Sequence, residues 1–276
     1  MKIVLVIAHK EICDALRNRW VAASALLLAA LSLTLALLGT APAGSAKASM
    51  LAVTNVSLAS LSVYLVPLIA LMLSFDALAG EFERGTMLLL LTYPVQRWQV
   101  LVGKFCGHLC VLFVAIVCGY GCAALLAAVS GDNGVDEWFG FGSLIGSSVL
   151  LGAVFLALGY LASMVVRERA TAAGIAIGLW IVLVVLYDLV LLGVLLSSQG
   201  SLAIGEQAFQ VLLLANPTDA YRLFNLAGSH GATLVSGLTE AGGGAATGTL
   251  LPLSVMTVWV LTPLVATSLL FRRREL

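Results

Sequence analysis

The chain has 276 residues, of which 61% are hydrophobic and 10% are charged, and its formal net charge at pH 7 is zero. Soluble domains contain about 25% charged residues, so this composition excludes a soluble globular protein. Six apolar stretches approach or exceed the ~20 residues that a helix needs to cross a bilayer, where backbone groups must be satisfied within the segment. The sequence therefore predicts an all-α membrane protein with spans at 20–38, 56–78, 105–129, 141–166, 170–196 and 250–271.

Residues 1–19 precede the first predicted span and form an amphipathic pattern, which predicts a helix in the plane of the membrane interface. Residues 20–38 followed by Ala41-Pro-Ala43 also fit a signal peptide with a cleavage site. However, nineteen residues containing both acids and bases precede this apolar run, which is longer than the usual 7–15 residues. We therefore expect an interfacial helix that is retained.

Lysine and arginine residues lie almost entirely on one side of the predicted spans. Of the 14 in the chain, only Lys47 and Arg222 fall on the other side. Cationic loops remain cytoplasmic, so we expect both termini in the cytoplasm, as an even number of spans requires. The topology rule accounts for the basic inner face, which gives no indication of a nucleic-acid partner.

Residues 80–104 join the second and third spans on the predicted cytoplasmic side. Gly80 and Gly85 have the spacing of a phosphate-binding loop, but Thr86 occupies the position where that motif needs a lysine. The apolar run 86–92 is too short to cross a bilayer, and Glu81 and Glu83 precede it. This pattern predicts a short surface helix with an apolar ridge and a charged rim, suited to a cytoplasmic partner. An ordinary inner loop is the alternative.

Two features inside the spans invite a functional interpretation. Cys106, His108 and Cys110 are candidate ligands for a soft metal such as Cu(I). Free cysteine is commonly a small buried hydrophobe and no CxxC is present, so we expect no metal site. Asp188 lies well inside the fifth span, where a charge must face a bundle interior, a water-filled cavity or a dimer seam. A tyrosine hydroxyl is one potential partner; alternatively, the span ends earlier and leaves Asp188 near the outer interface.

Residues 197–249 form the one large outer segment. Helical periodicity over 207–215 and 218–227 is interrupted at Asn216-Pro217-Thr218-Asp219, which is typical of a helix stop followed by a restart. We expect residues 200–230 to bind an outer partner, with the following candidate contact residues: Phe209, Asn216, Pro217, Asp219, Tyr221, Arg222 and Phe224.

Taken together, these elements resemble the type-2 ABC exporter permeases over essentially the whole chain, 1–276, as a single transmembrane domain. The resemblance rests on Glu81, Glu83, Gly85-Thr86, the leucine run, Pro94, Arg97 and Gly103-Lys104. It implies that a cytoplasmic coupling helix in loop 80–104 rests in a groove on a separate ATPase subunit. ATP and Mg²⁺ would then bind to that subunit, and this chain would be non-catalytic and hold no cofactor. The implied contact residues are Glu81, Glu83, Arg84, Gly85, Thr86, Met87, Leu88, Leu89, Leu90, Leu91, Pro94 and Arg97.

Three shorter stretches, at 93–98, 103–108 and 216–223, resemble the permease of the copper-associated system that matures nitrous oxide reductase. This resemblance implies a homodimer in the bacterial inner membrane, with two ATPase subunits and an outer β-helical protein. The cargo stays open between a copper species, a sulfur compound and none. The alternatives are an ABC-2 exporter of another substrate, a thiol-redox membrane enzyme, and a passive anchor or small channel; CxxC and HExxH are absent from the sequence.

Overall fold

The computed structural model describes residues 2–17, 19–38, 50–92, 95–130, 134–197, 206–227 and 250–274. Within these ranges every regular element is a helix, which confirms the all-α prediction. In chain order the elements are α1 (Lys2–Arg17), α2 (Arg19–Leu38), α3 (Met50–Ser74), α4 (Ala79–Glu83), α5 (Thr86–Leu91), α6 (Arg97–Ser130), α7 (Val135–Val165), α8 (Arg169–Trp180), the π-helix η1 (Ile181–Leu186), α9 (Tyr187–Ser197), α10 (Glu206–Ala215), α11 (Pro217–Ala227) and α14 (Leu250–Arg273).

Five helical stretches of the described residues are individually long and apolar enough to cross a membrane: Leu51–Glu83, Arg97–Val129, Val135–Val165, Arg169–Leu196 and Leu250–Arg273. Helices α1 and α2 meet at a bend of 70° and pass the same test as a pair, which gives up to six spans. The bend separates α1 from the first predicted span. Helix α6 begins at Arg97, eight residues before the start of the span predicted at 105–129. The charged residue Lys104 therefore lies inside the helix.

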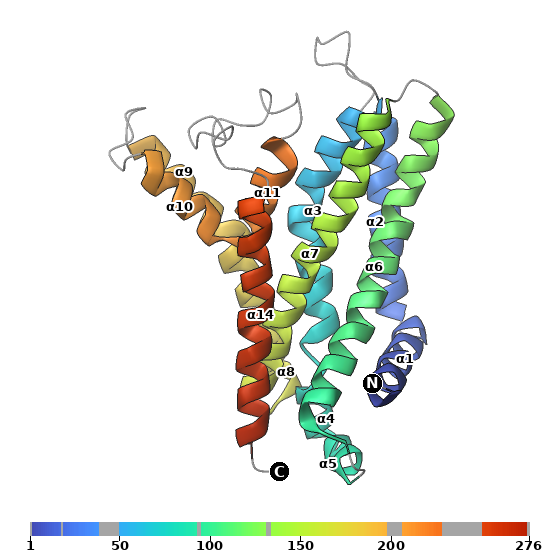
Figure 1. Ribbon diagram of the computed structural model, residues 1–276, viewed down its shortest axis with the longest axis vertical. Helices are drawn as coiled ribbons and strands as arrows, with labels where there is room; N and C mark the ends of the chain where they lie inside the picture. The colour runs from blue at the N-terminus through green and yellow to red at the C-terminus, as the bar shows by residue number, and fades with distance from the viewer. Residues whose placement is uncertain are drawn as a thin grey trace.

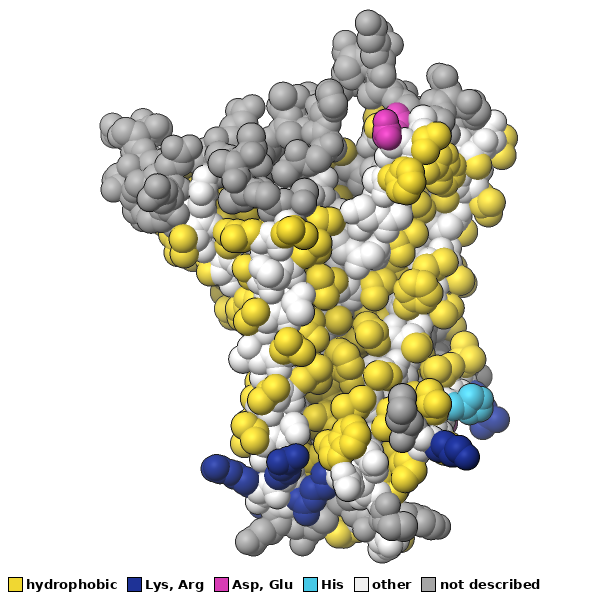
Figure 2. Space-filling model, viewed as in Figure 1, with side chains coloured by type: hydrophobic (Ala, Val, Ile, Leu, Met, Phe, Trp, Pro, Cys, Tyr) yellow, Lys and Arg dark blue, Asp and Glu magenta, His cyan; other side chains and the backbone are white. Residues whose placement is uncertain are grey.

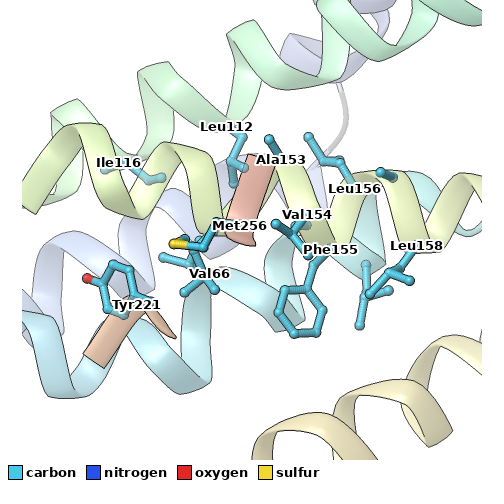
Figure 3. Packing of buried hydrophobic residues seen from close by; sticks show 14 of the residues in the cluster. Val66, Leu112, Ile116, Ala153, Val154, Phe155, Leu156, Leu158, Tyr221 and Met256 are labelled. Carbon is cyan, nitrogen blue, oxygen red and sulfur yellow. The ribbon is translucent and has the colours of Figure 1, made fainter. Parts of the chain in front are cut away.

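Helix α7 forms the centre of the bundle and is buried along most of its length. Helices α3, α6 and α14 pack around it, and Figure 3 shows Val66 of α3, Leu112 of α6 and Met256 of α14 close to the α7 side chains. Gly152 permits this close packing, since an added Cβ would lie 2.2 Å from a methyl carbon of Leu112.

Helix α1 packs on the inner part of α6 (Figure 1). Two glycines of α6 allow the close approach: a Cβ added at Gly103 would lie 2.8 Å from Cβ of Ile7, and one added at Gly107 would lie 2.7 Å from Cβ of Glu11. The other side of α1 leaves Leu5 exposed, as expected of an interfacial helix.

The two ends of the molecule differ in the charge of their exposed side chains. Figure 2 shows a broad hydrophobic surface with Lys and Arg side chains gathered toward the end that carries α4, α5 and the C-terminal end of α14. Acidic side chains of the described residues appear near the opposite end in this view. The prediction that the basic end is cytoplasmic follows from this distribution of charge.

Candidate functional site

The loop between α3 and α6 contains two short helices that turn sharply at Gly85. This residue has φ = +71°, a left-handed conformation that glycine adopts without strain. On α5, Leu88 and Leu89 are 54% and 68% exposed, whereas Met87 is fully buried in the main core. The apolar ridge predicted from the sequence is therefore formed by Leu88 and Leu89, and Met87 anchors it.

Helix α4 is bonded to α7 and α8. The hydroxyl of Ser163 on α7 accepts hydrogen bonds from the backbone N–H groups of Leu78 and Ala79, at 3.0 and 2.8 Å. The carboxylate of Glu83 accepts the N–H of Arg169 at 2.9 Å, which satisfies a free donor at the start of α8. A displacement of α4 would therefore be transmitted to α7 and α8 through these hydrogen bonds.

Helix α4 also contacts the C-terminal end of α14. The ring of Phe82 lies edge-on to Phe271, with 6.2 Å between ring centroids. The guanidinium of Arg274 lies 4.2 Å from the centroid of Phe82 and donates to the carbonyl oxygens of Met164 and Val166 at the end of α7. Phe82 thus lies in an interface shared by α4, α7 and α14.

Buried charges gather where α1, α4, α6 and α7 meet, and we call Glu11, Glu81, Lys104, His108 and Tyr160 the inner ionic cluster. The ammonium of Lys104 lies 2.7 Å from Glu81 Oε1 and 2.8 Å from Glu11 Oε1. His108 Nε2 lies 3.4 Å from Glu11 Oε2, and its Nδ1 lies 2.7 Å from the hydroxyl of Tyr160. Burial alone would raise the pKa of Glu11, but hydrogen bonds from His108 and Lys104 hold this pKa well below its ordinary value.

At the other end of the bundle, α10 and α11 are anchored in the fold through polar groups. The side chains of Asn216 and Thr218 donate to the carbonyl oxygen of Leu183 in η1, at 2.7 and 3.2 Å. Tyr221 of α11 is fully buried, and its hydroxyl lies 2.9 Å from that of Ser148 on α7. The Asn-Pro-Thr-Asp sequence therefore binds the outer segment to the π-helix of the fifth span.

Asp188 is paired with an arginine rather than with a tyrosine. Arg222 Nη1 lies 2.6 Å from Asp188 Oδ2 and 3.2 Å from Asp219 Oδ1, and we call these three residues the outer triad. The ring of Tyr64 on α3 lies 5.9 Å below the Arg222 guanidinium. Sequence reasoning missed this pairing, although Arg222 is the one arginine between the fifth and sixth predicted spans and was a visible candidate.

Comparison with known proteins identifies the family. The family model described as "ABC-2 family transporter protein" matches residues 5–276. This chain belongs to the ABC-2 transporter family. It is 43% identical over 271 residues to the "Probable ABC transporter permease protein NosY" of Stutzerimonas stutzeri, with 97% of each chain covered. It is 45% identical over 284 residues to the protein of the same name in Pseudomonas aeruginosa, with all of both chains covered.

The resemblance to type-2 ABC permeases is thus confirmed. In this family the membrane chain is a non-catalytic subunit, and a partner subunit hydrolyses ATP. Of the predicted ATPase contacts in this ABC-2 chain, Glu83, Arg84, Thr86, Leu88 and Leu89 are exposed and available to a partner. The side chains of Leu91 and Pro94 lie outside the described residues.

The other predicted ATPase contacts have roles within the chain. Glu81 faces Lys104, Met87 is buried, and Leu90 packs against the main core. Arg97 donates to the carbonyl oxygens of Phe271, Arg272 and Arg274, where it closes the C-terminus of α14. That Arg97 contacts the ATPase stays a prediction; within the chain, its guanidinium is bonded to the end of α14.

Most of the predicted outer contacts also have roles within the chain. Phe209, Asn216, Pro217, Asp219 and Tyr221 are all buried among the helices of this ABC-2 chain, so these side chains cannot form a partner's contact surface in this conformation. Arg222 and Phe224 are half-buried, and Arg222 is engaged in the outer triad. These positions were attractive in the sequence because they are polar or aromatic, but the structure uses them to hold α10 and α11.

The candidate metal ligands of α6 are not brought together. His108 faces Tyr160 and Glu11, whereas Cys110 is exposed and Cys106 is half-buried. Among the described residues there is no group of three histidine, cysteine or acidic side chains that could hold a metal ion. In this part of the chain, His108 serves the inner ionic cluster.

Proposed function

We propose that this chain is the permease subunit of an ABC transporter that takes part in maturation of nitrous oxide reductase, and that a separate cytoplasmic ATPase drives it through α4 and α5. One observation carries the coupling proposal: Leu88 and Leu89 project from a segment whose opposite side is fixed to the membrane helices. Exposed leucines framed by Glu83 and Arg84 form an apolar centre with a charged rim, which suits a protein partner.

Motion would spread from this segment through its bonded neighbours. When two ATPase subunits close on ATP, they would displace α5 and, across Gly85, α4. Ser163 would pass the displacement to α7, Glu83 to α8, and Phe82 to α14. Packed helices rearrange as rigid rods between discrete states rather than deforming continuously.

The proposed assembly contains two copies of this chain and two ATPase subunits in the bacterial inner membrane. ABC transporters need two such halves, and this chain supplies one. ATP and Mg²⁺ would bind to the ATPase. The role in nitrous oxide reductase maturation, and an outer β-helical partner associated with copper, rest on the resemblance of residues 93–98, 103–108 and 216–223 and on the similarity to the proteins named NosY. An outer partner would contact exposed positions of the outer segment, since the buried ones are engaged.

Copurification of the chain with its ATPase tests the coupling proposal. Leu88→Ser combined with Leu89→Ser removes the apolar ridge while leaving Met87 in the core. We expect the ATPase to be lost from the purified complex and the permease to remain folded, because exposed substitutions change stability by only about 0.5 kcal/mol. Leu250→Ser, at a still more exposed leucine that begins α14, is the matched control and should retain the ATPase.

Retention of the ATPase by the double variant would contradict the coupling proposal. Catalytic turnover by the purified chain without nucleotide would favour the thiol-redox alternative. Uptake or export of a copper or sulfur compound by sealed vesicles, compared with an ATPase-dead complex, distinguishes transport of cargo from transmission of motion alone.

A further inference from the structure

Lys104 is an unusual cation for the inner end of a membrane helix. The topology rule is satisfied by lysines that reach water, and long side chains near helix ends normally extend to the interface. Lys104 is instead only 2% exposed and lies between two carboxylates. Burying three charges together costs several kcal/mol for each ion, and well-packed apolar residues often stabilise a fold equally well. Stability alone therefore does not explain this arrangement.

The two carboxylates belong to segments that are far apart in the sequence. Glu11 lies on α1 and Glu81 on α4, and both carboxylates use their Oε1 atom to contact the same ammonium group of Lys104. A direct ion pair between α1 and α4 joins Lys10 to Glu81 at 3.8 Å, but the Lys10 side chain is 57% exposed and therefore screened by water. Lys104 thus provides the ionic connection between α1 and α4 that is buried away from water.

The remaining contacts of the cluster fix its geometry. The second oxygen of Glu11 faces His108, which in turn bonds to Tyr160 on α7, so the carboxylate has little freedom to turn away. Gly107 lets Glu11 approach α6 closely, since a Cβ at this glycine would lie 2.7 Å from Cβ of Glu11. Helix α1 is consequently held on α6 with its carboxylate directed at Lys104.

We propose that Lys104 is a positioning residue that makes α1 move together with α4, so that the ATPase drives the interfacial helix and, through it, α2. This inference rests on the proposed function, because it assigns a second consequence to the same displacement of α4 by the ATPase. Displacement of α4 would pull Glu81, and the shared ammonium would carry Glu11 and α1 with it. The first span would then be driven from its inner end in addition to the spans that contain α7, α8 and α14.

The test uses the permease assembled with its ATPase in lipid nanodiscs, with the five native cysteines replaced. Spin labels at Leu16 on α1, or at Thr92 after α5, are each paired with a label at Val165 at the inner end of α7; all three positions are exposed. Distances are measured by pulsed electron paramagnetic resonance with and without nucleotide. In the otherwise native complex we expect nucleotide to shift both distances.

Lys104→Met combined with Glu11→Gln and Glu81→Gln removes the ionic link without leaving an unpaired charge, which protects the fold where Lys104→Met alone would disturb it. We expect this neutral variant to keep the shift at Thr92 and lose the shift at Leu16. Lys10→Met, which removes the exposed cation next to the same carboxylates, is the matched control and should keep both shifts.

A shift at Leu16 that survives in the neutral variant would overturn the assignment, as would a native complex in which Thr92 moves and Leu16 does not. Failure of the ATPase to bind, or absence of any shift at Thr92 in the native complex, would instead refute the proposed function.

Discussion

The inner ionic cluster and the outer triad both place ion pairs inside the protein, but they differ in their balance of charge. At the inner end, Glu11 and Glu81 face Lys104, with Lys10 close to both carboxylates. At the outer end, Asp188 and Asp219 share the single cation Arg222. At the inner end two cations balance two carboxylates, whereas the outer triad has one carboxylate more than it has cations.

This difference has opposite effects on protonation. Burial and the nearby Asp188 carboxylate raise the pKa of Asp219 to about 7, even though Arg222 opposes the shift. Glu11 shows the reverse, because His108 and Lys104 hold its pKa below the ordinary value of 4.5. Glu11 should therefore keep its charge throughout the neutral range, whereas Asp219 should gain or lose a proton within it.

The largest expected effect comes from removing the cation of each group. Lys104→Met leaves two buried carboxylates with only the solvent-exposed Lys10 as a counter-ion and should destabilise the permease by about 3–5 kcal/mol. Arg222→Met should cost about 2 kcal/mol, since its side chain and that of Asp188 are each about one-fifth exposed. Denaturation in the same detergent measures both changes. Equal losses of stability would contradict the expectation that the more deeply buried cation contributes more.

A smaller effect is expected from pH at the outer triad. An acid with a raised pKa binds its proton more tightly in the folded state, so its contribution is present below the ordinary value of 3.8 and is lost as pH rises through about 7. Hydrogen exchange of residues 206–227, corrected for its intrinsic rate, should become faster as pH rises from about 5 to about 8. Asp219→Asn should abolish this dependence, and Asp136→Asn, an exposed acid at the outer end of α7, should preserve it. An unchanged profile in Asp219→Asn would assign the titration to another group.

The smallest effect is expected at Lys10. Its ammonium lies 3.2 Å from Glu11 and 3.4 Å from Asp14, but the side chain is mostly in solvent. Lys10→Met should therefore change the free energy of unfolding by less than about 1 kcal/mol. Thermal unfolding beside Lys104→Met checks this value. A loss as large as that of Lys104→Met would mean that net charge, rather than the buried geometry, stabilises the inner cluster.

The fold was largely predictable from the sequence because hydrophobicity is a local property. Each predicted span overlaps helical residues, although the fifth comprises α8, η1 and α9, and the leucine run after Gly85 contains the exposed ridge of α5. The family was also evident from the loop that includes Glu81, Glu83 and Arg97. The functions of individual polar residues were less accessible, since these depend on which helices meet in three dimensions.

Three cations illustrate this limit. Lys104 and Arg97 were assigned to the inner face by their position in the chain, but Lys104 connects α1 to α4 and Arg97 closes α14. Arg222 was placed on a contact surface, but it neutralises Asp188. In each case the sequence indicates the charge correctly, whereas the partner comes from a helix that periodicity cannot locate.

The π-helix η1 divides the fifth span into two parts with different attachments. In such a turn the hydrogen-bond ring is wider than in an α-helix, and at Leu183 the carbonyl oxygen accepts side-chain donors from Asn216 and Thr218. On the inner side, Arg169 at the start of α8 donates its N–H to Glu83 of α4, while Asp188 of α9 pairs with Arg222 of α11. The fifth span therefore consists of two segments with independent anchors: α8 is held by α4, and α9 is held by α11.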